Sequence, residues 1–168
     1  TLWNGENDAD YGKVTTGVGG GLCQLSNLIY WMTLHTPLTV TERYRHSYDV
    51  FPDSKRSQPF GSGATCAYNY LDLQIKNETT EPYQVIIYLT DVSLVGEWRS
   101  VSQPTNTYKV YEKDHQFTLE QWGGYVRYNT IYREVYNRNN ECIDDQFITE
   151  NHAIAMYPPF LSHGDERG

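Results

Sequence analysis

The sequence lacks both a long apolar run and a concentrated positive charge. Its longest hydrophobic stretch, around Val85 to Leu89, is far shorter than the ~20 residues that span a bilayer, so we predict no membrane-spanning segment. Acidic residues number 21 against 13 basic ones, which gives a net charge of −8. Acids flank the densest basic group, which consists of Arg43, Arg45, Lys55 and Arg56. The sequence therefore excludes a nucleic-acid partner and an anionic membrane surface, because both need a clustered basic surface.

Cysteine is scarce, with three residues at positions 23, 66 and 142. An odd number cannot pair completely within the chain, so at least one thiol is free. Cys23, His46 and Cys66 could supply soft metal ligands, but their spacing matches no zinc signature. We therefore expect no metal and no cofactor.

The sequence also lacks a recognisable secretory signal, which favours a cytoplasmic location. Residue 1 is Thr rather than Met, which suggests that an upstream segment has been trimmed. A cell-surface or extracytoplasmic location therefore remains an alternative. Composition does not predict the oligomeric state.

The most distinctive local feature is the run Gly17-Val18-Gly19-Gly20-Gly21, which ends a segment, residues 1–21, that we interpret as a loop. A helix is predicted over residues 22–35, because Pro37 disfavours helical angles at the residue before it. Within this helix, apolar residues at the spacing i, i+3, i+4, i+7 predict one core-facing stripe, formed by Leu25, Leu28, Ile29 and Met32.

Tyrosine, with 15 residues, is abundant and favours strands and half-exposed surfaces. Alternating patterns predict strands over residues 38–46, 64–76, 83–89, 107–112, 116–122, 125–136, 142–149 and 152–157. Hairpin turns are predicted at Gly123-Gly124 and at residues 137–140. These elements predict an α+β fold, in which one main helix after a Gly-rich loop packs on a mostly antiparallel sheet. Residues 1–100 would form the core and residues 101–168 a β-rich extension of the same compact unit.

Cys23 is the first candidate for chemistry, because it falls in the first turn of the predicted helix. Backbone N–H groups and the helix dipole favour a thiolate there. The predicted face of Cys23 carries Asn27, Tyr30 and Leu34 and lies opposite the apolar stripe, so the thiol would be free of the core. The alternative is a small, inert cysteine that fills space behind the glycines.

His46, at the end of the next predicted strand, is the candidate general base, and Asp72 on the following strand is the candidate group that orients it. Asp49 and Asn69 compete for the orienting role. The alternatives without a catalytic role are that His46 is a solvated histidine and that Asp72 is a surface carboxylate. Substrate contacts and an oxyanion hole are predicted from the glycine loop and the helix start, namely Gly19, Gly20, Gly21 and Gln24.

The run from Gly17 to Met32, which includes Gly-Gly-Gly-Leu-Cys-Gln-Leu-Ser-Asn, closely resembles the VanW family. The likeness continues through Arg43 and His46, through residues 61–65 and through 71–77. It implies a bacterial protein associated with glycopeptide (vancomycin) resistance or cell-envelope biology, and it implies no reaction. Members of this family usually carry Asp immediately before an Ala-Thr pair, where this chain has Gly63. If that Asp takes part in catalysis, then either Asp72 replaces it or the site is not catalytic in that way.

Three functions follow from these observations. The first is a cysteine-dependent amide hydrolase or acyl transferase that acts on a cell-wall-related peptide. The second is a non-catalytic module that binds peptidoglycan or a small peptide. The third is an accessory interaction protein that pairs through an exposed edge strand.

Overall fold

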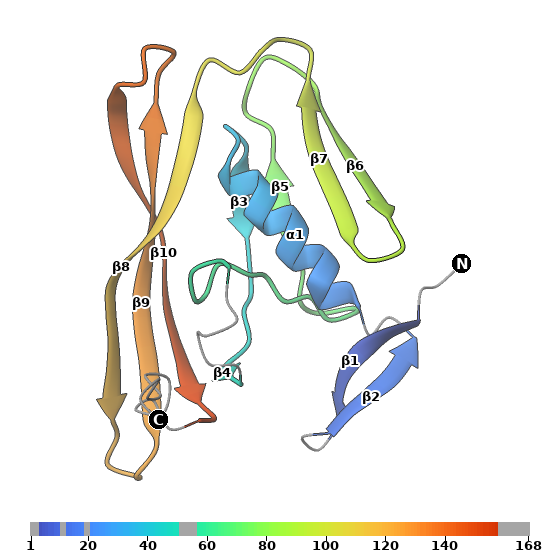
Figure 1. Ribbon diagram of the computed structural model, residues 1–168, viewed down its shortest axis with the longest axis vertical. Helices are drawn as coiled ribbons and strands as arrows, with labels where there is room; N and C mark the ends of the chain where they lie inside the picture. Colours follow the sequence, from blue (N-terminus) through green and yellow to red (C-terminus); the bar gives the residue numbers. More distant parts are fainter. Residues whose placement is uncertain (1–3, 11–12, 19–20, 51–56, 158–168) are drawn as a thin grey trace, which may run out of the picture. The chain divides into compact units, whose positions relative to one another are not determined.

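The computed structural model describes residues 4–10, 13–18, 21–50 and 57–157 (Figure 1). These residues form one α-helix and ten β-strands. The chain divides into two units. Unit 1 comprises residues 1–45 and 63–104, and unit 2 comprises residues 46–62 and 105–168. The segment 46–62 therefore belongs with the C-terminal strands, although it lies between two parts of unit 1 in the sequence.

Unit 1 contains the helix and three two-stranded antiparallel sheets. Its elements are β1 (Asn4–Asp10), β2 (Lys13–Val18), α1 (Leu22–Leu34), β3 (Thr39–Glu42), β5 (Gln74–Lys76), β6 (Tyr83–Leu89) and β7 (Leu94–Ser100). Strand β1 pairs with β2, β3 pairs with β5, and β6 pairs with β7 (Figure 1). The helix thus has short, separate strand pairs as neighbours rather than one continuous sheet.

Helix α1 packs mainly on β7. The indole N–H of Trp98 donates to the Thr33 hydroxyl at 3.1 Å, and that hydroxyl donates to the Ile29 carbonyl at 2.7 Å. An added Cβ at Gly96 would lie 2.7 Å from the Met32 side chain, so the missing side chain lets β7 approach the helix closely. The helix begins at Leu22, as predicted, and ends at Leu34, one residue before the predicted end, with His35 as its C-terminal cap.

The most deeply buried residues of α1 are not those of the predicted apolar stripe. Its buried residues are Ser26, Tyr30, Thr33 and Leu34, whereas the four residues of the apolar stripe are only half-buried. Tyr30 and Leu34 belong to the face that we assigned to Cys23. On that face Tyr30 and Leu34 are buried, Cys23 is half-buried and Asn27 is exposed, so burial in the helix does not follow the apolar stripe.

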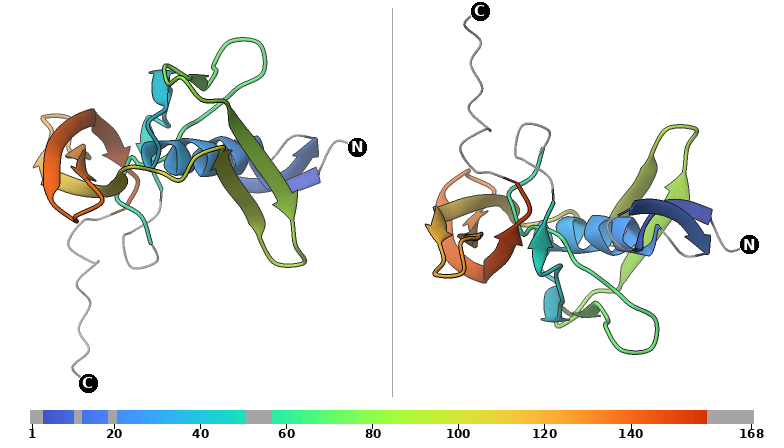
Figure 2. Two further views of the ribbon diagram at one scale, coloured as in Figure 1. Left: turned by 90° about the horizontal axis from the view of Figure 1, so that it is seen from above. Right: turned by 90° about the horizontal axis from the view of Figure 1, so that it is seen from below.

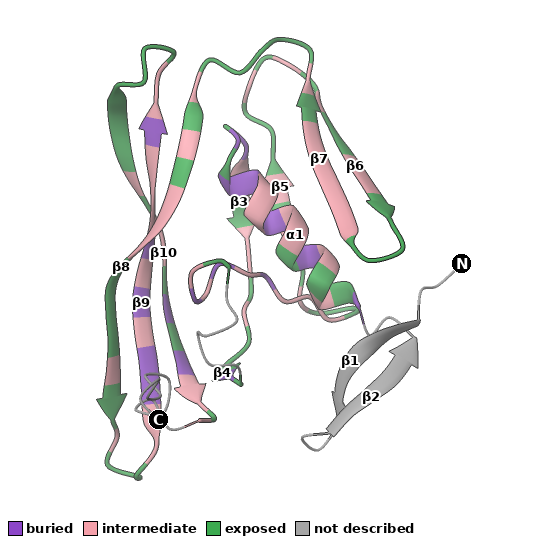
Figure 3. Ribbon diagram, viewed as in Figure 1, coloured by how far each residue is buried: buried purple, intermediate pink, exposed green. Residues whose placement is uncertain are grey.

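Unit 2 is a four-stranded sheet without a helix among its described residues. Its strands are β4 (Tyr48–Asp49), β8 (Thr107–Leu119), β9 (Tyr125–Tyr136) and β10 (Cys142–Ala155). Their spatial order is β4-β10-β9-β8, with β4 parallel to β10 and the other pairs antiparallel. The three long strands curl strongly, as the end-on views of Figure 2 show. Buried residues concentrate along the central strand β9 (Figure 3).

The structure corrects the predicted fold class. The chain is mostly β with one 13-residue helix, and its largest sheet carries no helix in the part that the structure describes, so the α+β prediction of a helix packed on one sheet was wrong. The predicted loop over residues 1–21 instead contains the hairpin β1–β2. The predicted strand over 64–76 reduces to its last three residues, β5, and strand β7 was not predicted. No helix in the described ranges has the length and apolar character required to cross a bilayer.

The contact of Gly61 with β10 provides a test of unit 2. Gly61 has a φ of +75°, and an added Cβ would lie 2.2 Å from Asn151 Cγ; Gly123 has a φ of +88° but open space around it. Both Ala substitutions incur the cost of a left-handed conformation, but only Gly61→Ala adds a clash. We expect Gly61→Ala to lower the free energy of unfolding by about 1–3 kcal/mol more than Gly123→Ala, as measured by urea denaturation. Equal losses would contradict this packing.

Candidate functional site

The start of α1 places Cys23 in the first helical turn, as predicted. Gly21 precedes the helix, and its carbonyl accepts hydrogen bonds from the N–H groups of Gln24 and Leu25 at 3.1 and 3.2 Å. The first turn carries no acidic residue. Cys23 is half-buried, so its sulfur is neither fully enclosed nor openly exposed.

The sulfur of Cys23 faces a second segment of unit 1. Its thiol donates to the carbonyl of Cys66 at 3.9 Å, and the thiol of Cys66 donates to the carbonyl of Leu22 at 3.7 Å. The two contacts join the start of α1 to residue 66, although each is a weak hydrogen bond, because a thiol is a weak donor.

The segment of residues 63–66, which we call the anchored loop, is held by side chains of α1. The Ser26 hydroxyl donates to the Ala64 carbonyl at 2.6 Å, and the Ala64 N–H donates to the side-chain oxygen of Asn27 at 2.7 Å. The Thr65 N–H donates to the Tyr44 carbonyl at 2.8 Å. Both backbone groups of the buried Ala64 are thereby satisfied, as buried polar groups require.

Arg43 also holds the anchored loop. Its Nε donates to the Gly63 carbonyl at 2.8 Å, and its guanidinium lies 4.8 Å from the Tyr30 ring centroid. Burial lowers the pKa of Arg43 from its usual value. An added Cβ at Gly63 would lie 2.4 Å from the side-chain oxygen of Asn27. At the position where the resembled family usually carries Asp, this chain thus has no room for a side chain unless Asn27 moves.

The other predicted site residues lie in both units. Gln24 is exposed, and Gly19 and Gly20 lie outside the described residues. Asp72 is exposed in unit 1, and its carboxylate accepts from the Leu73 N–H at 2.9 Å. His46 is exposed and belongs to unit 2, and the strand predicted over 38–46 ends at Glu42. The grouping of Cys23, His46 and Asp72 into one catalytic site stays a prediction.

The two competing orienting residues have different surroundings. Asn69 is exposed in unit 1, with a φ of 78° in a tight turn. Asp49 is buried in unit 2, with 3% of its surface exposed. Its carboxylate belongs to a buried network that the sequence did not predict.

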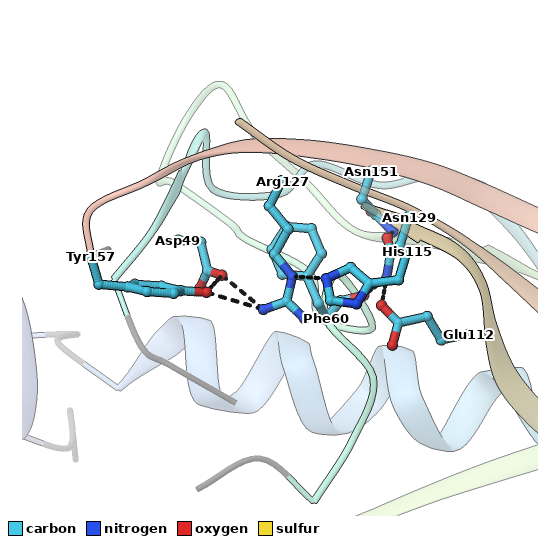
Figure 4. A network of polar contacts seen from close by, with 8 residues as sticks. All are labelled: Asp49, Phe60, Glu112, His115, Arg127, Asn129, Asn151 and Tyr157. Atoms are coloured by element: carbon cyan, nitrogen blue, oxygen red, sulfur yellow. Dashed lines mark hydrogen bonds and ion pairs between the residues drawn. The ribbon is translucent and has the colours of Figure 1, made fainter. Parts of the chain in front are cut away.

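Arg127 forms the centre of this network (Figure 4). It is 1% exposed, and its Nη1 donates to Asp49 at 3.1 Å and to the Tyr157 hydroxyl at 3.2 Å. Tyr157 donates to the same Asp49 oxygen at 2.7 Å. Arg127 Nε donates to His115 Nε2 at 2.9 Å, and its guanidinium lies 4.4 Å from the Phe60 ring centroid. A buried cation is thus matched by one carboxylate and by hydrogen bonds, which offset part of its desolvation cost.

A second polar layer continues the network along β9 (Figure 4). The amide of Asn129 donates to the Phe60 carbonyl and to Glu112, both at 2.7 Å. Asn151 donates to the Asn129 oxygen at 2.9 Å, because the register of β9 and β10 sets these residues opposite one another. The layer ties residues 57–62 to the sheet.

This network is hard to predict because its residues occupy core positions of a strand. Arg127, Asn129 and Ile131 alternate on one face of β9 and are all buried. A polar residue at an inward position is an available signal, but the direction of the face becomes known only when the strand is paired. In the described part of the chain, no group of three or more His, Cys, Asp and Glu side chains could hold a metal ion.

The phenol of Tyr157 provides a pH-dependent test. Burial, then the hydrogen bond to Asp49 and its negative charge, raise the pKa of Tyr157 to about 12. The folded-state pKa exceeds the unfolded value of about 10, so the protonated phenol stabilises the fold below pH 10. This stabilisation is lost as the pH rises towards 12. We expect the free energy of unfolding to fall more steeply over this range in the unchanged protein than in Tyr157→Phe.

The matched control is Tyr48→Phe, which removes a phenol that is 56% exposed in the same unit. Urea denaturation at a series of pH values should give this variant the same slope as the unchanged protein. Identical slopes for Tyr157→Phe and the unchanged protein would show that the buried phenol does not couple to folding.

Comparison with known proteins provides a family for these features. The sequence matches the family described as VanW like protein over residues 6–99. It is 35% identical over 148 residues to a protein of Enterococcus faecalis named Vancomycin B-type resistance protein VanW, and the alignment covers 88% of this chain. The chain spans about half, 54%, of the length of that relative. No solved structure matches the fold.

The match to the family spans most of unit 1, including α1, the anchored loop and Arg43, and the alignment to the relative extends well beyond it. The family resemblance that rested on the motif around Cys23 is therefore confirmed, because both comparisons extend far beyond this motif. The relative is bacterial, in agreement with the predicted bacterial origin. The chain belongs to the VanW family.

Proposed function

We propose that the chain acts in bacterial resistance to vancomycin-type glycopeptides, as a non-catalytic module that binds a fragment of peptidoglycan. The name of the Enterococcus faecalis relative supports the link to vancomycin resistance. The observation that carries the binding role is a pair of exposed tyrosines on a tight turn directly after the anchored loop. Tyr68 is 93% exposed and Tyr70 is 77% exposed.

The turn that carries these tyrosines is closed by backbone hydrogen bonds. The Ala67 N–H donates to the Leu71 carbonyl at 3.0 Å, while the N–H groups of Tyr70 and Leu71 donate to the Ala67 carbonyl at 3.2 and 3.1 Å. Asn69, between the two tyrosines, has a φ of 78°. Asparagine tolerates this left-handed conformation better than most residues. The two rings are therefore displayed from a backbone that is fixed before any ligand arrives.

The anchored loop adds to this preorganisation. Ala67 follows directly after residues 63–66, which Ser26, Asn27 and Arg43 hold in place. A binding surface on a fixed backbone loses less conformational entropy when it binds. The motif around Cys23 then has a structural purpose, which is to hold the loop that presents the tyrosines.

Tyrosine rings suit a peptidoglycan fragment as ligand. Their faces stack on the apolar faces of sugar rings and on peptide groups, and their hydroxyls donate and accept hydrogen bonds. Tyrosine also contributes a large contact area at a low entropic cost, because it has two rotatable side-chain bonds. These properties favour recognition without turnover.

Removal of each exposed ring tests the binding role. We expect Tyr68→Ala and Tyr70→Ala each to weaken binding of a soluble muropeptide about 10-fold, because a well-placed aromatic contact is worth about 1–1.5 kcal/mol. Isothermal titration calorimetry measures this affinity. Tyr88→Ala is the control, since it removes a tyrosine that is 47% exposed on β6 of the same unit. Unchanged affinity in both turn variants would refute the proposal.

A cysteine enzyme is the second candidate, and the place of Cys23 in the first turn of α1 favours it. In this hypothesis His46 takes the proton of the Cys23 thiol, and Asp72 orients the imidazole. The Cys23 sulfur then attacks an amide or acyl carbon of a cell-wall-related peptide. Gly19, Gly20, Gly21 and Gln24 contact the substrate. The thiol would first have to exchange its hydrogen bond with Cys66 for one with the base.

Alkylation distinguishes the two candidates. An enzyme predicts that, in reduced protein, iodoacetamide labels Cys23 much faster than Cys66 and Cys142, with an apparent pKa below about 7.5. It also predicts that Cys23→Ser abolishes turnover of a cell-wall peptide. The binding module instead predicts that Cys23→Ser retains muropeptide affinity. Mass spectrometry of tryptic peptides measures the labelling rates.

A further inference from the structure

Two cysteines of unit 1 that lie far apart in the sequence contact each other's segments. Cys23 and Cys66 are 43 positions apart, yet each thiol donates to a carbonyl of the opposite segment, at 3.9 and 3.7 Å. Both residues are half-buried. The contacts are reciprocal: one sulfur lies against the backbone of Cys66 and the other against the residue before Cys23.

We propose that Cys23 and Cys66 form a site of disulfide formation, which cross-links the start of α1 to the anchored loop. A disulfide requires Cα atoms about 4.4–6.8 Å apart, and the proposal rests on the contact of each sulfur with the backbone of the opposite segment, at 3.9 and 3.7 Å. Cys142 takes no part, because it is an exposed residue of unit 2 whose thiol donates locally to the Asp144 carbonyl at 3.5 Å.

The backbone on both sides of the pair is already fixed by other contacts. Ser26, three residues after Cys23, and Ala64, two residues before Cys66, are joined by a 2.6 Å hydrogen bond. The Ala64 N–H is bonded to Asn27, and Thr65 is paired with Tyr44. The two thiols are therefore held near each other in the reduced protein, which favours formation of the bond within one chain.

The oxidant in this step is a low-molecular-weight disulfide such as oxidised glutathione. The Cys23 thiol, as its thiolate, attacks one sulfur of the oxidant, and one small thiol leaves. The Cys66 thiolate then attacks the Cys23 sulfur of the mixed disulfide, and the second small thiol leaves. Two protein thiols are oxidised, one small disulfide is reduced, and the two thiol protons end on the released small thiols.

The cross-link has two consequences for unit 1. It removes the nucleophile that a cysteine enzyme would need, so an oxidised chain cannot use Cys23 for catalysis. It also adds a covalent anchor to the loop that precedes Tyr68 and Tyr70. Because the bond closes a loop of more than 40 residues, it restricts the unfolded chain strongly and should raise stability.

The test uses the full chain with Cys142→Ser, which leaves the proposed pair as its two cysteines. Incubation with oxidised glutathione should remove both free thiols, lower the mass by two hydrogen atoms and yield one tryptic peptide pair linked through Cys23 and Cys66. The melting temperature should rise by more than about 5 °C, and dithiothreitol should reverse the rise. Reversal distinguishes the bond from irreversible oxidation.

A second variant isolates the resolving step. Cys66→Ser combined with Cys142→Ser should stop at a glutathione adduct on Cys23 and show no comparable rise in melting temperature. Stable glutathione adducts on both Cys23 and Cys66 in the Cys142→Ser chain would overturn the proposal. Loss of both thiols without a rise in melting temperature would also overturn it, because the bond would then have formed in a distorted chain.

Discussion

The pairing of helix side chains with the backbone of Ala64 is the constraint on which unit 1 depends. A loop residue that is 1% exposed must have both its N–H and its carbonyl satisfied. Ser26 and Asn27, adjacent in α1, supply the hydroxyl donor and the amide acceptor. This pairing buries Ser26 and holds the segment that carries Cys66 against the start of α1. The environment of the thiol is therefore a consequence of a backbone requirement rather than of the thiol itself.

Unit 2 depends on a different constraint, which is the burial of a charged side chain against one face of its sheet. Arg127 lies on the central strand, and its neighbours supply one carboxylate, a phenol and an imidazole nitrogen that all match its donors. Removal of one member of such a buried pair is costly, whereas an apolar replacement of the whole group can be neutral. The specific geometry, rather than the charge itself, is what fixes the short strand β4 and the segment around Phe60 against β9 and β10.

The sequence predicted well those elements whose bounds are set by residues next to them in the chain. Helix α1 ends where Pro37 requires it, and the turn at Gly123 uses the left-handed angle that glycine permits. Strands β6 and β9 have the predicted bounds, because their runs of β-favouring residues are bounded by turn residues. The predictions of secondary structure failed where pairing with distant residues decides whether a segment forms a strand. Residues 4–10 and 13–18 have loop-like composition and still pair as antiparallel strands. Residues 64–73 have a strand-like pattern but serve mainly as the anchored loop and its turn.

The sequence by itself determined the family, the helix and the wealth of strands, because motifs, caps and turn residues act over a few positions. It also located Cys23 at a helix start. Only the tertiary structure decided which residues of that helix are buried, that the carbonyl of Cys66 accepts the Cys23 hydrogen bond, and that Arg127 is a core residue. The physical reason is that buried polar groups must find partners, and those partners lie far away in the sequence.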